Sequence, residues 1–498
     1  MIDLQKKNKR IAFIVMAFFA AIYCSISLVN NYLFRTYALD LGLHIHAAYD
    51  YAHFRANYSM LLQPIYAPRN QLSDHFDLMV MLLSPLTWVF GQATLLLAQI
   101  GSILFGGYGI YKYFSSKARN SSLPLVAMFH FYSVWGIYSA LSFDYHSSVI
   151  AAMMLPWFIY YFDKKNIPGS VLFFILIMIS KEVMGLWLFF IGIGLCIHHF
   201  KTNRKLALRA LYFSGAGMVY FLSMISYIIP SLAPQGSTYM HFAFDALGDT
   251  PGLAFKTVIT SPMYVLRLLF ESPMPDLFAI KPELHVYIVL SGGFALFLRP
   301  QFLVMLISIY AQKLFHNDPI KWGLNYHYCI EFVPVLSMAL FSWINDLEGS
   351  RRQKLVGITV TVITFAATIT SFYHRYSIYY SEAESSFLDM EHYRQSFDPA
   401  IVHQTIGKIP ADASVSAGPS LVPHLALRDT IYCFPYTKNT DFIVLFSNGN
   451  STFPLDQKSF FRSLEALKRD SVYSVVYNRN QLIIFQNKKY KKKVDFDL

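Results

Sequence analysis

MIDLQKKNKRIAFIVMAFFAAIYCSISLVNNYL, residues 1–33, joins a basic start to a long apolar run. The run begins at residue 11 and contains about 23 mostly apolar residues, enough to cross a hydrocarbon core about 30 Å thick. Lys6, Lys7, Lys9 and Arg10 precede it, and cations beside a span favour the cytoplasmic side. A cleaved signal peptide is the competing interpretation, but the run is too long and no small-residue cleavage pattern precedes Asn30. We therefore expect a retained span with a cytoplasmic N-terminus and an extracytoplasmic loop after it.

The composition indicates that most of the chain lies in a membrane. Of its 498 residues, 55% are hydrophobic and only 14% are charged, and its mean hydropathy is positive. These values are typical of a polytopic α-helical membrane protein rather than of a soluble domain. The net charge of +11 comes from short basic clusters between apolar runs, so it indicates topology, and no nucleic-acid partner is expected. The four cysteines suggest neither a disulfide framework nor a thiolate metal site.

Apolar runs mark the candidate spans. Basic clusters at 164–165 and 351–354 face the cytoplasm only if the segment 77–91, which is short and contains Pro85, dips into the membrane and returns. About eleven spans then remain, in a domain of residues 1–373 whose first extracytoplasmic loop is 34–76. A threading in which 77–91 crosses and 168–199 forms one kinked helix stays open and leaves both termini on the same sides. The runs lie near 11–33, 77–91, 93–111, 122–141, 147–162, 168–180, 183–199, 206–229, 282–298, 301–315, 324–345 and 355–373.

From residue 374 the chain becomes more polar, and residues 374–498 predict a small α/β domain. DQKSFFRSLEALKRD is an amphipathic helix pattern, and it lies among short β-rich segments. Those segments are DASVSAG, TIYCFP, DFIVLF, SVYSVVY and QLIIFQ. The threading places this domain on the extracytoplasmic side of the plasma (inner) membrane.

Asp40 stands where the first outer loop begins. An ionised side chain near hydrocarbon costs about 2.5–3.5 kcal/mol on insertion scales, so a charge at a helix mouth usually has a use. One interpretation is that Asp40 caps a helix that begins near Leu41. The other is that Asp40 is a general base for a hydroxyl, because a low dielectric at the membrane edge raises the pKa of a carboxyl group. The residues alone leave both open.

Histidines gather around the same loop, at His44, His46, His53 and His75. In a helix, residues 44 and 46 point about 200° apart, and no HExxH spacing is present. Hydrogen-bonding histidines at a membrane interface are therefore favoured over a zinc site, and no metal ligand is predicted. A divalent cation is neither predicted nor excluded.

Lys181 and Glu182 stand between two apolar runs. A neutralised ion pair is one interpretation, although neighbours on a helix point in different directions and pair poorly. A cation at the outer mouth of a span is also suited to holding a phosphate. Asp144, His146 and His327 supply further groups that suit sugar hydroxyls or a phosphate.

These motifs resemble, in order and from about residue 38 to 435, the membrane-protein family called domain of unknown function 2079. The family is grouped with the GT-C glycosyltransferases, which use polyprenyl-phosphate-linked sugars and keep a catalytic Asp in the first extracytoplasmic loop. The resemblance implies a GT-C-like fold with Asp40 in that position. His46 and the pair 77–78 depart from the usual family pattern, which leaves donor or acceptor preference open. The matching text is ALDLG (38–42), HF (75–76), FDYH (143–146), KE (181–182), YHY (326–328) and SLVPHLALRDTIYCFP (420–435).

The leading hypothesis is an inverting membrane glycosyltransferase that moves a sugar from a polyprenyl-phosphate donor to an extracytoplasmic glycan or lipid acceptor. Asp40 is the expected base, and the absence of a glycine-rich phosphate cradle favours a donor carried by lipid. The alternative is a lipid or glycan transporter or flippase without chemistry, and a receptor or assembly factor is a third. The donor phosphate is expected at Lys181, His327 and Tyr328, and the substrate at His44, His75, Asp144, His146 and Glu182.

Overall fold

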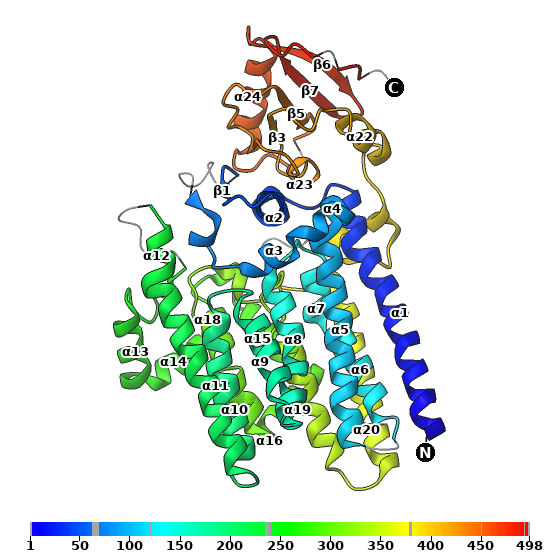
Figure 1. Cartoon of the computed structure of the whole chain (residues 1–498), viewed down its shortest axis with the longest axis vertical. Coiled ribbons are helices and arrows are strands. Elements are labelled where there is room, and N and C mark those ends of the chain that lie inside the picture. The colour runs from blue at the N-terminus through cyan, green and yellow to red at the C-terminus, as the bar shows by residue number, and fades with distance from the viewer. Residues whose placement is uncertain are drawn as a thin grey trace.

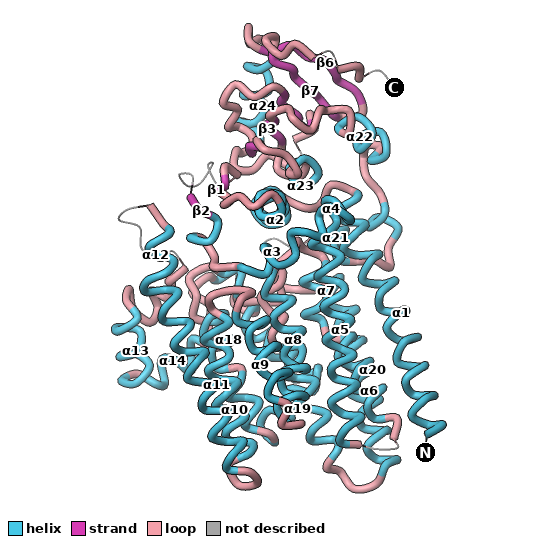
Figure 2. Tube along the Cα trace, in the orientation of Figure 1, coloured by secondary structure: helices cyan, strands magenta, loops and turns pink. Residues whose placement is uncertain are grey.

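The chain forms a helical bundle with a smaller domain at one end (Figure 1). The computed structural model describes residues 2–61, 69–118, 121–234, 239, 241–377, 381–449, 451–492 and 494–496, without the side chains of residues 2–5. The N-terminus lies at the end of the bundle opposite the smaller domain, which contains the C-terminus. Figure 2 shows that strands are confined to this domain, apart from the short pair β1 (Tyr58–Ser59) and β2 (Arg69–Asn70).

The bundle is apolar both inside and outside. Trp135 and Trp187 are fully buried, whereas Phe297 and Tyr212 are 75% and 70% exposed. Helices that are apolar on all faces are typical of a membrane span. The bundle contains α1 (Ile2–Tyr32), α5 (Thr94–Lys117), α6 (Leu123–Ser133), α7 (Trp135–Leu141), α8 (Ser147–Asp163), α9 (Ile167–Met178), α10 (Met184–His199), α11 (Arg204–Ser223), α12 (Ile229–Leu232), α13 (Pro251–Thr260), α14 (Pro262–Leu268), α15 (Ile280–Ile288), α16 (Ala295–Leu298), α17 (Pro300–Met305), α18 (Ile307–Leu314), α19 (Phe332–Asn345) and α20 (Ser350–Tyr373).

Within the described residues, four helical segments are long and apolar enough to cross a membrane. They are Lys6–Tyr32, Leu78–Lys117, Arg204–Leu232 and Ser350–Tyr373. Four shorter apolar helices accompany them, Leu123–Ser133, Ile167–Met178, Met184–His199 and Phe332–Asn345. The expected total of eleven spans stays a prediction.

Three short helices lie between the bundle and the smaller domain, α2 (Leu43–Ala52), α3 (Leu78–Leu83) and α4 (Thr87–Phe90) (Figure 1). The apolar segment near 77–91 is therefore broken around Pro85 into α3 and α4, at this end of the bundle. Trp88 and Val89 of α4 are 65% and 72% exposed, as suits a segment that lies in a membrane interface. Residues 62–68 of the predicted outer loop lie outside the described residues.

The C-terminal domain contains the five strands expected from the sequence, in the order β4-β3-β5-β7-β6. The strand β3 pairs in parallel with β4 and β5, and β7 pairs antiparallel with β5 and β6. Every residue of β5 is buried, because the strand lies in the middle of the sheet. The elements are β3 (Val415–Ala417), β4 (Ile431–Cys433), β5 (Phe442–Phe446), β6 (Tyr473–Arg479), β7 (Leu482–Asn487), α21 (Glu382–Ser385), α22 (Pro399–Ile406), α23 (Val422–Leu425) and α24 (Gln457–Lys468), the predicted amphipathic helix.

The C-terminal domain contacts the segment that follows α1. The Arg35 guanidinium donates to the carbonyls of Ala383 and His392, at 3.0 and 2.7 Å. Gly42 lies against α23, and a Cβ built there would be 2.8 Å from Val422 Cγ1. Glycine is thus required at position 42 by the close approach of the C-terminal domain and not by a left-handed turn, since its φ is −59°.

Basic residues gather at the opposite end of the bundle. Asn8, in the basic start, donates to the carbonyl of Ser121, and Lys117 pairs with Asp163 at 2.7 Å. The α10–α11 and α19–α20 connections lie at this end as well (Figure 1), and the helices that follow them begin with Arg204 and Lys205 in α11 and with Arg351, Arg352 and Lys354 in α20. The first loop and the C-terminal domain therefore share one end of the bundle, and the basic clusters share the other.

Candidate functional site

Asp40 lies in a π-helical turn, Ala38–Gly42, that joins the end of α1 to α2. Asp144 holds this turn in place, since its Oδ2 accepts hydrogen bonds from the backbone amides of Tyr37 and Leu41, at 2.8 and 3.2 Å. Asp144 is fully buried, and its Oδ1 has no partner in the described part of the chain. Among the described residues the Asp40 carboxylate accepts no backbone amide. The capping interpretation of Asp40 is therefore wrong, because Asp144 performs that role from the loop before α8.

The Asp40 carboxylate faces a polar cluster. Its Oδ1 lies 3.5 Å from His146 Nε2. Burial raises the pKa of Asp40 to about 6, the nearby Lys181 ammonium opposes the rise, and the Asp74 carboxylate adds to it. Asp40 is therefore ionised at neutral pH, with a pKa close to the range that suits a general base.

Two histidine rings stack beside Asp40. The rings of His146 and His327 lie 3.4 Å apart between centroids, and the ring of Phe143 stacks with that of His146 at 5.5 Å. Burial lowers the pKa of both histidines well below the usual value, and the proximity of His327 and Lys181 respectively adds to this. His327 Nδ1 is buried and has no hydrogen-bond partner in the described part of the chain. Both imidazoles are thus neutral at pH 7, and His327 keeps a free ring nitrogen for a ligand.

His44 borders the same cluster from the first turn of α2. Its Nδ1 is 2.7 Å from the backbone carbonyl of Asp40, and its Nε2 is 3.8 Å from Asp77 Oδ2. Asp77 is itself engaged, since it caps α3 through the amides of Met79 and Val80 and accepts the Ser147 hydroxyl. Burial raises the pKa of Asp77 to about 7.

Lys181 and Glu182 have different surroundings, as the turn between α9 and α10 requires. Glu182 is fully buried and accepts hydrogen bonds from Tyr239, His75 and the Phe76 amide, at 2.8, 3.0 and 3.1 Å. Burial alone would raise the pKa of Glu182, but His75 and its hydrogen bond hold it well below the usual range. The half-buried Lys181 ammonium makes no hydrogen bond or ion pair within the described residues. The two neighbours do not neutralise each other, so the ion-pair interpretation is wrong.

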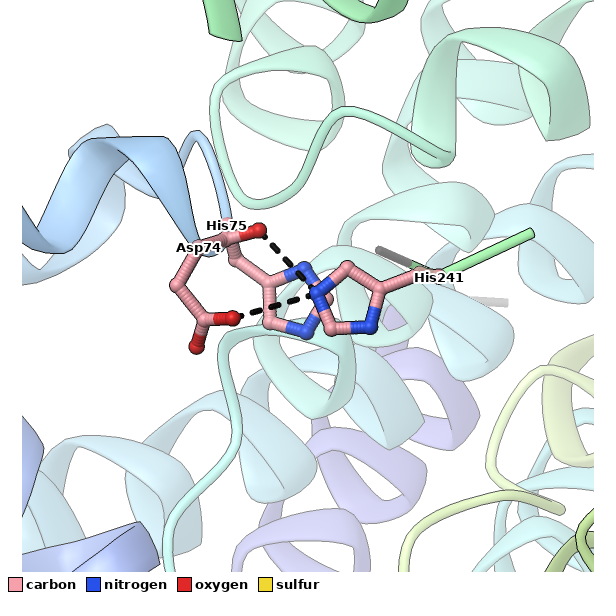
Figure 3. Close-up of side chains that lie close together, drawn as sticks. All are labelled: Asp74, His75 and His241. Atoms are coloured by element: carbon pink, nitrogen blue, oxygen red, sulfur yellow. Dashed lines mark hydrogen bonds and ion pairs between the residues drawn. The ribbon is translucent and has the colours of Figure 1, made fainter. Parts of the chain in front are cut away.

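A second group of ionisable side chains adjoins Glu182. His241 Nε2 contacts both the backbone carbonyl and Oδ1 of Asp74, at 3.1 and 3.2 Å, and the ring of His75 stacks on that of His241 with centroids 4.0 Å apart (Figure 3). A comparable group, Asp163, His198 and His199, lies at the opposite end of the bundle, beside Lys117.

The profile of a family of predicted membrane proteins, domain of unknown function 2079, matches residues 30–484. The chain belongs to this family. One solved structure with a similar chain is ArnT from Cupriavidus metallidurans bound to undecaprenyl phosphate. It has 10% sequence identity, a TM-score of 0.49, and a match that covers 95% of this chain and 98% of that chain. No curated protein matches significantly.

In this DUF2079 chain, the polar residues of the first loop divide between two places. Asp40 and His44 face the cluster described above. His46 and Asp50 instead bind Asn57, at 3.1 and 2.8 Å, and His53 is exposed beside Tyr49. His44 and His46, two residues apart, thus do not share a site, as their helical spacing predicts.

Several residues of the cluster had no role in the sequence-based prediction. His241 and Asp74 carry no spacing signal, because they are far apart in the chain, although Asp74 adjoins the predicted His75. Lys321 is a third residue of this kind. Its ammonium is 3.0 Å from His316 Nε2 and 5.6 Å from the centre of the Tyr328 ring. Burial and the proximity of Lys181 lower the pKa of Lys321 to about 8. Its position shortly before the NYHY text was the only available signal.

Proposed function

We propose that the chain is a GT-C type membrane glycosyltransferase that moves a sugar from a polyprenyl-phosphate donor to an extracytoplasmic acceptor. The observation that carries the proposal is the Lys181 ammonium, which has no partner among the described residues and acts on the carboxylate of Asp40, whose pKa burial raises to about 6. An anion-binding cation and a base are what this transfer requires. Both stand at one end of a membrane bundle, where a lipid-linked donor presents its phosphate.

In the proposed reaction, Asp40 accepts the proton of an acceptor hydroxyl while the hydroxyl oxygen attacks the anomeric carbon of the donor. The bond between that carbon and the phosphate oxygen breaks, and the polyprenyl phosphate leaves with the electron pair. Lys181 binds the phosphate charge, and His327 and Tyr328 complete its site, with Lys321 beside them. The configuration at the anomeric carbon is inverted, because attack and departure occur on opposite faces.

The acceptor side is assigned to the side chains that face the Asp40 carboxylate. His44 and His146 face Asp40 and are proposed to contact the sugar or the acceptor. Asp144 is fully buried and its Oδ2 is occupied by the turn that carries Asp40, and Glu182 is occupied by His75. We therefore propose that Asp144, Glu182 and His75 shape the substrate cleft by positioning its walls.

A transport function predicts a different distribution of charge. Transporters keep their ionisable groups near the midplane of the bilayer, at discontinuous helices. In the described part of this chain the cluster around Asp40 lies instead where the bundle meets the C-terminal domain.

The two functions are separable with one donor. Purified full-length protein in nanodiscs, given radiolabelled polyprenyl-phosphate sugar and a membrane extract as acceptor source, is expected to release polyprenyl phosphate and to label a second product. The matched assay uses sealed vesicles, in which a flippase would move the intact donor between leaflets. Intact donor in the first assay together with translocation in the second would refute the transferase.

The proposed orientation is tested by single-cysteine labelling in intact cells, in a background with Cys24 and Cys196 replaced by alanine. Lys458→Cys, at an exposed position of α24, is expected to react with a membrane-impermeant maleimide without permeabilisation. Lys164→Cys, exposed at the basic end of the bundle, is expected to react only after permeabilisation. The reverse pattern would put the Asp40 cluster in the cytoplasm and contradict the proposed acceptor.

A further inference from the structure

Asp74, His75 and His241 present their ligand atoms to one another. One ligand atom from each lies within 4.8 Å of the other two. The Asp74 Oδ1 to His241 Nε2 distance is 3.2 Å. Ligand atoms about 2.0–2.2 Å from a tetrahedral zinc ion lie about 3.3 Å apart, so this spacing is already suited to a metal. The close-up in Figure 3 shows the three side chains converging from two segments of chain.

The surroundings of His75 match a metal ligand in a second respect. A ring nitrogen that binds a metal is usually oriented by a carboxylate that takes the hydrogen of the other ring nitrogen. His75 Nδ1 lies 3.0 Å from Oε1 of the buried Glu182, which Tyr239 and the Phe76 amide hold in place. This hydrogen bond engages Nδ1, so Nε2 of His75 keeps a lone pair that can bind a metal.

We propose that Asp74, His75 and His241 bind a first-row transition-metal cation, with zinc as the reference ion, and leave a fourth coordination position open. Two imidazoles and one carboxylate form the ligand set of open zinc sites, whereas magnesium and calcium prefer oxygen ligands alone. All three side chains are partly exposed, which leaves access for the ion and for water at the fourth position. The proposal goes beyond the sequence, which predicts no metal ligand, and it does not depend on the transferase reaction.

The comparable group at the other end of the bundle provides the control. Asp163 there is already neutralised, since its Oδ2 accepts from Lys117 at 2.7 Å and its Oδ1 lies 3.0 Å from His199 Nε2. In the described part of the chain Asp74 pairs with no lysine or arginine. A cation is therefore expected at the Asp74 group and not at the Asp163 group.

The test measures zinc directly on full-length protein purified in detergent with an affinity tag that contains no histidine. After treatment with a chelator, the wild type is expected to take up one zinc ion per chain, measured by mass spectrometry of the metal and by competition with a coloured chelator. Cobalt is expected to give the visible absorption of a tetrahedral site, and an excess of magnesium should not displace zinc.

Variants assign the ion to its ligands. Glu182→Gln, which removes the carboxylate that orients His75, is expected to weaken zinc binding by about 10–100-fold. His241→Ala removes a ligand and is expected to weaken zinc binding by more than that. His199→Ala, from the Asp163 group, should bind zinc like the wild type. Asp74→Asn is the second variant if His241→Ala does not accumulate. It keeps a hydrogen-bond acceptor for His241 but loses the charged ligand, so its zinc binding is expected to be weakened as in His241→Ala. Equal zinc affinity in the wild type and the Asp74 or His241 variant, or loss in His199→Ala alone, would overturn the proposal.

Discussion

Asp40→Asn is expected to lower the rate of sugar transfer by about 10²–10⁴-fold, the usual effect of removing a general base. Asparagine has the size of aspartate but cannot accept the proton of the acceptor hydroxyl. Expression and melting temperature should stay within the range of surface substitutions, because the Asp40 carboxylate caps no helix in the described structure and the turn is held by Asp144. Donor turnover and thermal unfolding of the same preparation measure both quantities.

Asp50→Asn is the matched control from the same stretch. Asp50 binds Asn57 and Arg55, at 2.8 and 2.9 Å, away from the Asp40 cluster, so its amide should leave transfer within a few-fold of the wild type. Transfer by Asp40→Asn at the level of this control would exclude Asp40 as the base.

The same assignment predicts a pH profile. The base works only when ionised, and burial raises the pKa of Asp40 to about 6, so the rate should fall about tenfold for each pH unit below that value. The titratable groups around Asp40 include His44, His146, Lys181, Asp74, Asp144 and Tyr328. Burial lowers the pKa of His146 well below its usual value, so this ring stays neutral through the transition. A rate that does not change between about pH 5 and 8 at saturating donor would contradict the assignment.

Lys181→Ala is expected to weaken binding of the donor and to raise its KM about 10–150-fold, because a hydrogen bond to a charged group contributes about 1.5–3 kcal/mol. The melting temperature should change little, since the ammonium has no hydrogen-bond or ion-pair partner in the described part of the chain. Lys181→Arg should recover part of the affinity, as it keeps the charge but presents a planar fork in place of an ammonium. Initial rates over a range of donor concentrations separate KM from kcat.

Lys117→Ala, which removes a cation at the opposite end of the bundle, should leave the KM for the donor unchanged. If Lys181→Ala fails to accumulate in the membrane, or binds the donor like the Lys117 variant, Lys181 is a structural residue and the phosphate site lies elsewhere. Asp40→Asn and Lys181→Ala test separate parts of the proposal, because Asp40→Asn removes proton transfer and Lys181→Ala removes anion binding.

The sequence alone determined the class of protein and most of its elements. Hydropathy and β-rich segments are local signals, and they predicted the membrane character, the apolar helices and all five strands of the C-terminal domain. The motifs also predicted the family, whose profile covers residues 30–484. Asp40, His146, Lys181 and His327 were selected individually from the sequence, because charge near hydrocarbon is rarely retained without a use.

Only the tertiary structure decided how these residues are related. Asp144 takes the capping role that the sequence offered to Asp40, from a position more than a hundred residues away. Asp74 and His241 are also far apart in the chain, so the sequence does not indicate their contact. Lys181 and Glu182 are adjacent in sequence, yet the fold gives them opposite surroundings. Hydropathy and spacing report which side of an element is buried, whereas a site depends on which elements pack together. That packing is decided by long-range contacts, such as that between Gly42 and Val422, which no local pattern records.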